Sequence, residues 1–381
     1  MWLLCDLLMK TGFDLAVIGA GIVGLAHALA AARRGLKVVV IDRDAQANGA
    51  SVSNFGFITV TGQQTGDCWR RAMRSRDVWA QIAPEAGIEV IHQGLGVAVT
   101  RPESVAVLEA FRRTGMGEQC ELLTPAQAHR RMPALRSDAL QAVLYSPHEL
   151  RVESRDAIPR LAAWLERAHG VSFMRQTLVT GISLPSIETT AGTLQAQAAV
   201  VCPGDDYLSL YPERIAAYGL TRCALQMLRV RPARPVMMGA ALMSDPSLVR
   251  YLGWSELPES QALRARLEQE TPELLEHGIH LIAVQSGDGS LVVGDSHVYA
   301  PTPGPFGLQT VDDLILRELD AVADLPGRTV SERWMGVYAS APDRLMLVDR
   351  PAEQVRLVIV TSGTGASTAF GIAEEVIDEL L

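Results

Sequence analysis

Lysine is almost absent from this sequence: Lys10 and Lys37 are the only two, and nearly all positive charge is carried by arginine. The formal net charge is -9, so the chain lacks the basic excess typical of proteins that bind nucleic acids or anionic membranes. An anionic substrate would need a local basic pocket, because the overall field does not attract it. We therefore predict a small-molecule substrate and no nucleic-acid partner.

Cysteine is scarce, and its spacing excludes two kinds of site. No two cysteines have the Cys-x-x-Cys spacing, so neither a structural zinc site nor a disulfide framework is indicated, as expected for a protein of the reducing cytoplasm. The five are Cys5, Cys68, Cys120, Cys202 and Cys223. The histidines show no metal-ligand spacing either, and we predict no metal. They include His92, His129, His148, His169, His277 and His280, while His27 is expected to pack inside a helix.

Long hydrophobic runs are also missing. The opening MWLLCDLLMK is apolar but short, carries Asp6, and lacks the basic start and cleavage site of a signal peptide. We predict no membrane span, and the sequence leaves open whether Met1 or Met9 is the start. A chain of 381 residues, 48% of them hydrophobic and 20% charged, is expected to fold into two connected globular domains.

The strongest local signal is one strand–helix–strand unit near the N-terminus. An apolar strand at 15–18 leads into Gly19-x-Gly21-x-x-Gly24, a helix follows over 22–34, and a second apolar strand at 38–41 closes at Asp42. In such a unit the glycines allow the tight turn, the approach of a pyrophosphate and the packing of helix on strand. The phosphate binds at the positive end of the helix, and the terminal acid accepts hydrogen bonds from a ribose. The pattern predicts dinucleotide binding but does not separate FAD from NAD.

The order of the remaining segments favours FAD. An NAD enzyme usually continues with further strand–helix units, whereas here the second strand runs into the small-residue segment 48–56, which suits a flat ring system. The other pieces of the nucleotide domain lie far along the chain. One is the strand 198–201 followed by Cys–Pro–Gly204, and the other is the strand 357–360, which leads through TSGTG at 361–365 into a helix over 366–380.

At this point the sequence closely resembles the D-amino acid oxidase family of flavoproteins, which includes glycine and sarcosine oxidases. The resemblance runs from about residue 14 to the C-terminus. The segments that carry it are VIGAGIVG (17–24), VVVID (38–42), ASVSNFG (50–56), LRVES (150–154), AAVVCPG (198–204), GSLVVGDSH (289–297), WMGVYASAPD (334–343) and TSGTGASTAFG (361–371). More narrowly, ASVSNFGFITVTGQ is similar to a subgroup found with phosphonate-degradation enzymes, whose substrate is thought to be an aminoethylphosphonate derivative.

The resemblance implies an α/β (α+β overall) fold with a Rossmann-type FAD-binding domain containing a parallel sheet. A second, substrate-binding domain would contribute a mainly antiparallel sheet that roofs the flavin. The expected FAD domain is discontinuous, 13–61, 146–221 and 331–381, with 62–145 and 222–330 forming the substrate domain. In the substrate domain we expect helices at 70–82, 103–113, 124–131 (with a capping box from Thr124 to Gln127) and 260–276, and strands at 97–99, 225–230, 280–284 and 290–293.

The resemblance also implies the residues that bind FAD. The pyrophosphate lies against the glycine turn, Asp42 and Arg43 frame the adenosine, and Val179, on a strand over 177–179, meets the adenine through its backbone. Residues 51–54 border the flavin, and 363–365 face its ribityl chain and pyrimidine end. The full set is Gly19, Ala20, Gly21, Ile22, Val23, Gly24, Asp42, Arg43, Ala50, Ser51, Ser53, Asn54, Val179, Pro203, Gly204, Gly363, Thr364 and Gly365.

Departures from the family pattern narrow the chemistry. Sarcosine-oxidase-like members attach FAD to a cysteine where this chain has Gly336, so we expect non-covalent FAD. Glycine-oxidase-like members clamp the substrate carboxylate with an arginine where this chain has Tyr338, which disfavours an α-amino acid bound in that way. Some relatives use a lysine to help oxygen react, and neither Lys10 nor Lys37 can reach the flavin. The acceptor, molecular oxygen or another, stays open.

The sequence identifies no catalytic base, and the substrate-side residues are only candidates. They are His297 and Tyr299 beyond a roof strand, Tyr338, and Gln63, which alternates with Thr59 and Thr61 along an expected strand. Arg70, Arg71, Arg74 and Arg76 are expected on a solvated helix face, and Trp254 and Trp334 either in the core or along the cleft. Ordinary strand-end, surface or core positions explain each of these equally well.

These observations predict an FAD-dependent oxidoreductase that oxidises the C–N bond of a small primary or secondary amine to an imine. The favoured substrate class is an amine with an anionic group, such as an aminophosphonate. Two alternatives remain, namely oxidation of a 2-hydroxy acid on the same fold and a flavin-binding subunit without turnover of its own.

Overall fold

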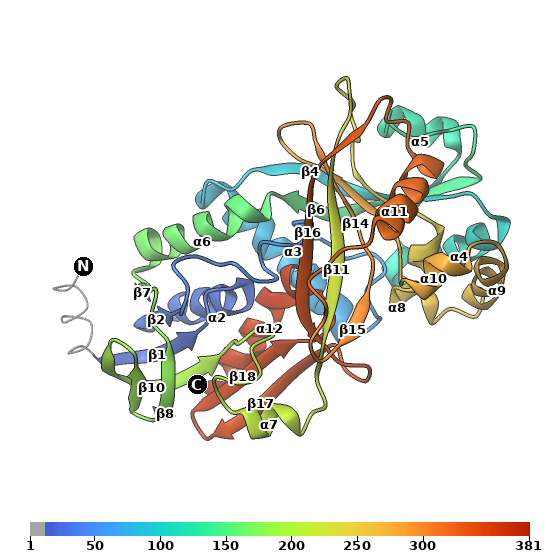
Figure 1. Ribbon diagram of the computed structural model, residues 1–381. Coiled ribbons are helices and arrows are strands. Elements are labelled where there is room, and N and C mark those ends of the chain that lie inside the picture. The colour runs from blue at the N-terminus through green and yellow to red at the C-terminus, as the bar shows by residue number, and fades with distance from the viewer. Residues whose placement is uncertain (1–11) are drawn as a thin grey trace.

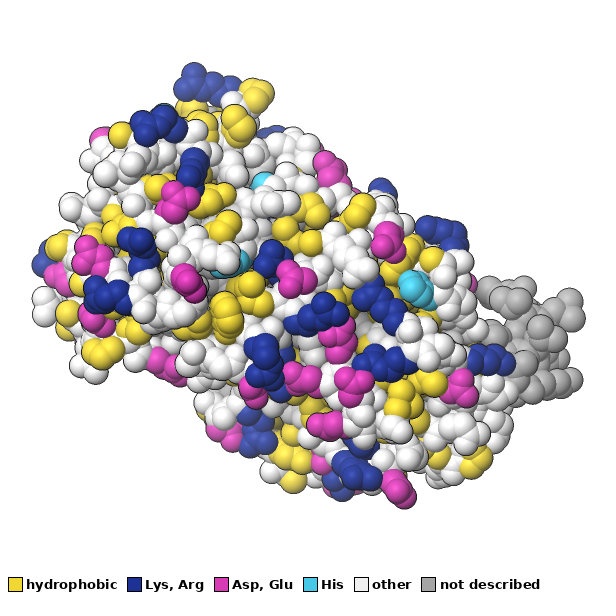
Figure 2. All heavy atoms as spheres, turned by 180° about the vertical axis from the view of Figure 1, so that it is seen from behind, with side chains coloured by type: hydrophobic (Ala, Val, Ile, Leu, Met, Phe, Trp, Pro, Cys, Tyr) yellow, Lys and Arg dark blue, Asp and Glu magenta, His cyan; other side chains and the backbone are white. Residues whose placement is uncertain are grey.

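The computed structural model describes residues 12–381, which form two β-sheets with helices packed on their faces (Figure 1). The predictions about the start at Met1 or Met9 and about Lys10 lie outside these residues. Within them, no helix is long and apolar enough to cross a membrane. Basic and acidic side chains are intermingled over the face seen in Figure 2.

The first sheet has five parallel strands at its centre, in the order β18, β10, β1, β2, β7. The antiparallel strands β17, β8 and β9 extend it. Its members are β1 (Gly12–Ile18), β2 (Val38–Ile41), β7 (Ser172–Met174), β8 (Val179–Ser183), β9 (Ser186–Thr189), β10 (Gly192–Val201), β17 (Met346–Ala352) and β18 (Val355–Val360). The central strands are buried on both faces, and this explains why their sequences are continuous apolar runs.

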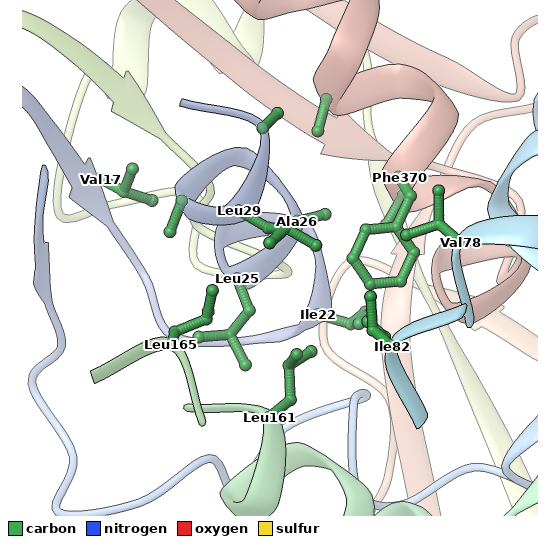
Figure 3. Packing of buried hydrophobic residues seen from close by; sticks show 14 of the residues in the cluster. Val17, Ile22, Leu25, Ala26, Leu29, Val78, Ile82, Leu161, Leu165 and Phe370 are labelled. Atoms are coloured by element: carbon green, nitrogen blue, oxygen red, sulfur yellow. The ribbon is translucent and has the colours of Figure 1, made fainter. Parts of the chain in front are cut away.

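Helix α2 (Ile22–Ala32) forms the centre of the core on one face of this sheet, together with α3 (Asp67–Glu85), α6 (Ser154–His169) and α12 (Gly365–Leu380). Figure 3 shows how Leu25 of α2 lies between β1 and α6, while Phe370 of α12 meets α2 and α3. The Phe370 ring stands edge-on to Trp79, with 5.3 Å between ring centroids. Because α2 is apolar on nearly all sides, it can only be stable inside such a layer.

The second sheet is mainly antiparallel and stands beside the first (Figure 1). Only β12 and β4 pair in parallel. The strands are β3 (Phe57–Ile58), β4 (Val90–Val99), β5 (Glu121–Leu123), β6 (Ala142–Val152), β11 (Thr221–Arg231), β12 (Ala241–Met243), β13 (Ile282–Gln285), β14 (Leu291–Gly294), β15 (Val298–Ala300) and β16 (Thr329–Ser340). The expected combination of a parallel sheet and a mainly antiparallel sheet is confirmed.

The remaining helices cover the second sheet or connect it to the first. They are α4 (Pro102–Arg112), α5 (Pro125–Arg131), α7 (Pro212–Ala216), α8 (Leu252–Ser255), α9 (Ser260–Glu270), α10 (Pro272–Glu276) and α11 (Gln309–Val322), with the 3₁₀ turns η1 (Gly115–Gly117) and η2 (Asp245–Val249). The capping box of α5 is present, since Thr124 Oγ1 accepts from Gln127 N and Gln127 Oε1 from Thr124 N. The division into two domains stays a prediction. Strands 57–58 and 329–340 belong to the second sheet, although the predicted boundaries assign nearly all of their residues to the FAD domain.

Several local predictions need correction. The helix expected over 260–276 is two helices that break at Thr271, because Pro272 disfavours a helical conformation in the residue before it. The strand expected through Thr59 and Gln63 ends at Ile58, and the chain turns there instead. The strand expected at 177–179 begins only at Val179, and that expected at 280–284 begins only at Ile282.

The arginines of α3 are not simply solvated, as the sequence suggested. Arg71 and Arg74 pair with Glu375 and Glu374 of α12, at 2.7 Å in both cases, and they tie the two helices together. Arg70 lies 3.4 Å from Glu375 as well. The repulsion between neighbouring arginines of α3 is offset by the glutamates that α12 supplies as partners.

Truncation of Phe370 to alanine should destabilise the protein, because it opens a cavity where α2, α3 and α12 meet. We expect a loss of about 3–5 kcal/mol in the free energy of unfolding, measured by urea denaturation. Leu208→Ala is the control, since Leu208 is 79% exposed and should change that free energy by less than about 0.5 kcal/mol. Equal effects of the two substitutions would contradict this account of the core.

Candidate FAD and substrate site

The glycine turn after β1 is built by close backbone contacts. A Cβ on Gly24 would lie 1.9 Å from the carbonyl oxygen of Gly19, so α2 can approach the turn only with glycine there. Gly19 has a φ of +107° and sits against the carbonyl of Cys202, which a Cβ would approach to 2.4 Å. A side chain at either position would therefore push the helix away from the strand.

Asp42 at the end of β2 holds this turn from the other side. Its carboxylate accepts hydrogen bonds from Ala20 N at 2.6 Å and Asp44 N at 2.8 Å. Arg43, expected beside the adenosine, pairs with Asp206 at 2.5 Å. The acid that was expected to contact a ribose thus also fixes the backbone of the phosphate turn.

The small-residue segment 48–56 lies against the start of α2. Ser51 Oγ accepts a hydrogen bond from Ile22 N at 2.9 Å, which satisfies one of the free N–H groups at the helix start. Asn54 Oδ1 accepts from Gly56 N at 2.6 Å and from Ser154 Oγ at 2.7 Å, and these bonds fix the end of the segment. The segment is therefore an ordered wall of the cavity.

The C-terminal turn TSGTG faces the same cavity from β18. Gly363 has a φ of +72°, and a Cβ there would come within 3.0 Å of the Tyr338 ring. Ser362 and Thr364 share a hydrogen bond of 2.7 Å between their hydroxyls, and Thr361 Oγ1 donates to Arg344 O at 2.6 Å. This places Tyr338 of β16 directly against the turn that was expected to meet the flavin.

One continuous cavity of about 510 Å³ connects all of these features. Of the residues expected to bind FAD, all but Ala20 line it, and so do the four substrate-side candidates Gln63, His297, Tyr299 and Tyr338. His297 and Tyr299 follow β14, as predicted, and Tyr299 lies within the next strand, β15. Thr59 also lines the cavity, whereas Thr61 is buried and donates to Ser146 Oγ at 2.7 Å. Trp254 is fully buried in the core.

Arg250, just after η2, is the important residue that sequence reasoning missed. It lines the cavity, and its guanidinium donates to Tyr299 Oη at 3.0 Å. No carboxylate among residues 12–381 forms a salt bridge with it, although most arginines of this protein have such a partner. Nothing in the local sequence marks it, because the turn that carries it meets Tyr299 and Tyr338 only through the tertiary fold.

A second polar group in the cavity consists of His280, Asp295 and His297. Burial raises the pKa of Asp295 to about 7, and the charge of Arg250 opposes that rise. Burial, and secondly the charge of Arg250, lower the pKa of both histidines well below the usual range. The prediction of no metal site was based on the spacing of the histidines, including His280, and did not take Asp295 into account. The segment GDSH does hold Asp295 two residues before His297, but its partner His280 lies just before β13, outside that segment.

Comparison with known proteins agrees with this geometry. The model of the FAD dependent oxidoreductase family matches residues 14–379. This chain belongs to that family. A glycine oxidase from Geobacillus kaustophilus is 27% identical over 211 residues, which are 51% of this chain and 55% of that protein. A bifunctional protein ThiO/ThiG from Nostoc is 23% identical over 88% of this chain and 47% of its own length. The match thus spans about half the length of these relatives.

Solved structures share the whole fold. L-proline dehydrogenase from P. horikoshii has a TM-score of 0.76 at 18% identity, over 96% of this chain and 92% of that one. Glycine oxidase from Geobacillus kaustophilus has a TM-score of 0.75 at 18% identity, over 97% and 95%. An L-alpha-glycerophosphate oxidase from Mycoplasma pneumoniae, with FAD bound, has a TM-score of 0.73 at 15% identity, over 97% and 95%.

The residues present fit FAD. The glycine turn, the N-terminus of α2 and Asp42 form one end of the cavity, where a pyrophosphate and a ribose would be held. Gly363 to Gly365 and residues of the roof strands β11 and β16 line the same cavity. Polar side chains that the dinucleotide contacts do not require, among them Arg250, Asp295 and His297, line it as well.

Asp42→Ala should weaken FAD binding, because it removes an expected ribose contact and frees the N–H of Ala20. We expect the dissociation constant for FAD to rise about 10–100-fold, as for loss of hydrogen bonds to a charged group. Titration of the apoprotein with FAD, followed by fluorescence, measures this change. The control is Asp313→Ala on the outer face of α11, which should leave the constant unchanged.

The flavin should be released completely when the protein is denatured. The resemblance predicts Gly336 at the position of the attachment cysteine, and the described cysteines Cys68, Cys120 and Cys223 do not line the cavity. Cys202 does line it, but burial raises its pKa far above the range in which a thiolate forms. Acid precipitation followed by absorbance of pellet and supernatant tests this. Yellow colour that stays with the pellet would contradict non-covalent binding.

Proposed function

We propose that this protein uses FAD to oxidise the C–N bond of a small amine that carries an anionic group, with an aminophosphonate as the favoured substrate class. The observation that carries the proposal is Arg250, a partly buried guanidinium that lines the cavity, donates to Tyr299 Oη and forms no salt bridge among residues 12–381. A cation that is partly withdrawn from water is stabilised by an opposite charge, so the cavity is suited to an anionic ligand.

Two tyrosines shape the space between Arg250 and the TSGTG turn. Tyr299 accepts a hydrogen bond from Arg250, while Tyr338 packs against Gly363. Burial, as the largest cause, raises the pKa of Tyr338 well above its usual range, so its hydroxyl stays protonated and can donate to a ligand. An anion bound at Arg250 would therefore leave the rest of a short substrate pointing toward the Gly363 turn.

The proposed reaction breaks the C–H bond beside the nitrogen. Bound FAD supplies the acceptor for the hydride, and the carbon and nitrogen form an imine that water hydrolyses. The residues of the chain orient the substrate through its anion, exclude water under the roof strands and favour the neutral amine by withdrawing it from water. A substrate whose anion is held by Arg250 explains how Tyr338 can replace the arginine of glycine-oxidase-like relatives.

We also propose that the reduced flavin passes its electrons to an acceptor, either molecular oxygen or another compound. Lys37 lies over the Phe13 ring, 5.1 Å from its centroid, and does not line the cavity. Arg250 is then the cation nearest to the expected substrate. The cytoplasmic location predicted from the sequence is likewise part of the proposal.

An anaerobic screen of flavin bleaching tests the substrate class directly. 2-Aminoethylphosphonate or its N-methyl derivative should bleach the flavin, whereas glycine and sarcosine should not, because the family's carboxylate clamp is absent. Bleaching by 2-hydroxyglutarate alone would favour oxidation of a 2-hydroxy acid. No bleaching by any amine or hydroxy acid would leave a flavin-binding subunit as the better interpretation.

Arg250→Met should raise the substrate concentration for half-maximal bleaching by about 30-fold or more, because the anion loses a buried charged partner. Arg250→Lys is the matched control, which keeps the charge and should recover part of the affinity. N-Methylethylamine, which lacks the anion, should bind equally weakly to all three proteins. An unchanged concentration dependence in Arg250→Met would remove the basis of the proposal.

A further inference from the structure

The side chains of His280, Asp295 and His297 are held together by the backbone around β13 and β14. His280 and Asp295 face each other through two backbone hydrogen bonds, from Asp295 N to His280 O at 3.1 Å and from His280 N to Asp295 O at 3.4 Å. His297 N donates to His277 O at 3.0 Å. The three residues are only 3%, 4% and 8% exposed, and all of them line the cavity.

Their polar atoms converge without a hydrogen bond between them. His280 Nε2 lies 3.3 Å from Asp295 Oδ1, and His297 Nε2 lies 3.7 Å from Asp295 Oδ2. One ligand atom from each residue lies within 4.8 Å of the others. Asp295 Oδ1 is buried and has no hydrogen-bond partner in the described part of the chain. Such an arrangement is costly unless something positive lies between these atoms.

The tautomer of one histidine is set for coordination. His297 Nδ1 lies 2.8 Å from the carbonyl oxygen of Gly278, to which it can only donate. Neutral His297 therefore carries its lone pair on Nε2, the nitrogen that faces Asp295. A backbone carbonyl that orients an imidazole in this way is the usual support of a metal-binding histidine.

We propose that His280, Asp295 and His297 form a three-ligand site for a divalent transition-metal ion, with open coordination positions toward the cavity. Two imidazole nitrogens and one carboxylate favour ions such as Zn²⁺, Fe²⁺ or Co²⁺ over Mg²⁺ and Ca²⁺, which prefer oxygen ligands. The site lies on the substrate side of the cavity, beside Tyr251, whose ring is 5.3 Å from that of His280. It is separate from the glycine turn and Asp42.

Arg250 connects this site to the substrate, a step that rests on the proposed function. Arg250 donates to Tyr299 Oη at 3.0 Å, and the Tyr299 ring stacks on that of His297 with 6.4 Å between centroids, so the guanidinium lies beside the site and disfavours a second cation while the cavity holds no anion. A phosphonate dianion would neutralise both positive charges by coordinating the metal and pairing with Arg250. Metal and anion should therefore bind cooperatively, each strengthening the other.

The test measures metal content on the FAD-loaded protein. The holoprotein is treated with a chelator, equilibrated separately with Zn²⁺ and Co²⁺, desalted and analysed by plasma mass spectrometry. We expect about one equivalent per chain. Asp295→Asn and His297→Gln should each weaken binding by at least about tenfold. His277→Gln is the matched control, a neighbouring histidine whose side chain lies outside the three-residue site, and it should bind like the natural protein.

Retained FAD and an unchanged melting temperature show that each variant is folded. Less than about a tenth of an equivalent in the natural protein, or equal binding by natural protein and Asp295→Asn, would overturn the proposal. Calorimetric titration with Zn²⁺ in the presence and absence of methylphosphonate tests the coupling to the anion. Metal binding without bleaching by aminophosphonates would refute the proposed substrate and keep the metal site. Bleaching by aminophosphonates in a protein that takes up no metal when equilibrated with Zn²⁺ or Co²⁺ would do the reverse.

Discussion

The contact between Gly24 and the Gly19 carbonyl is the constraint on which the cofactor end depends. It brings the start of α2 against the end of β1, and so the free N–H groups of the helix point into the cavity. Asp42 and Ser51 then fix the same turn by hydrogen bonds to Ala20 N and Ile22 N. A helix displaced by even one methyl group would lose these bonds together, because all of them depend on one backbone position.

The roof imposes a different requirement. Strand β16 pairs with β11 along its length and carries Tyr338 to the Gly363 turn, so the sheet that closes the cavity also determines its chemistry. The polar groups at this end are buried beyond what their own bonds can satisfy. Among residues 12–381, Arg250 forms no salt bridge with an acid, and the buried Asp295 Oδ1 accepts no hydrogen bond. Fixed charges of this kind are found where a ligand is expected to complete the network.

How far the sequence predicts the structure differs between the two ends. The strand–helix–strand unit was predictable because its helix boundaries, apolar strands and glycines lie within a single local stretch, and TSGTG could be located by the same logic. Three strands of the second sheet, β11, β13 and β14, were predicted to within four residues at either end, β4 was predicted only at its C-terminal end, and β16 was not predicted as a strand. The partners of these strands were not predictable, since the pairing of β11 with both β14 and β16 joins residues far apart in sequence. The break at Thr271 was predictable from local sequence, because Pro272 disfavours a helical conformation at Thr271, but the prediction of one helix over 260–276 did not take this proline into account.

The sequence by itself determined the family, and it predicted the dinucleotide turn, the role of Asp42 and a tyrosine, Tyr338, at the position of the usual clamp. Each of these depends on residue type at a short, fixed spacing, or on an aligned position. Only the tertiary structure placed Arg250 beside Tyr299 and brought His280 to Asp295. Burial is what makes an unpaired arginine or a pair of neutral histidines chemically significant, and burial arises when distant segments pack together. Local sequence therefore does not show which of these side chains will be buried.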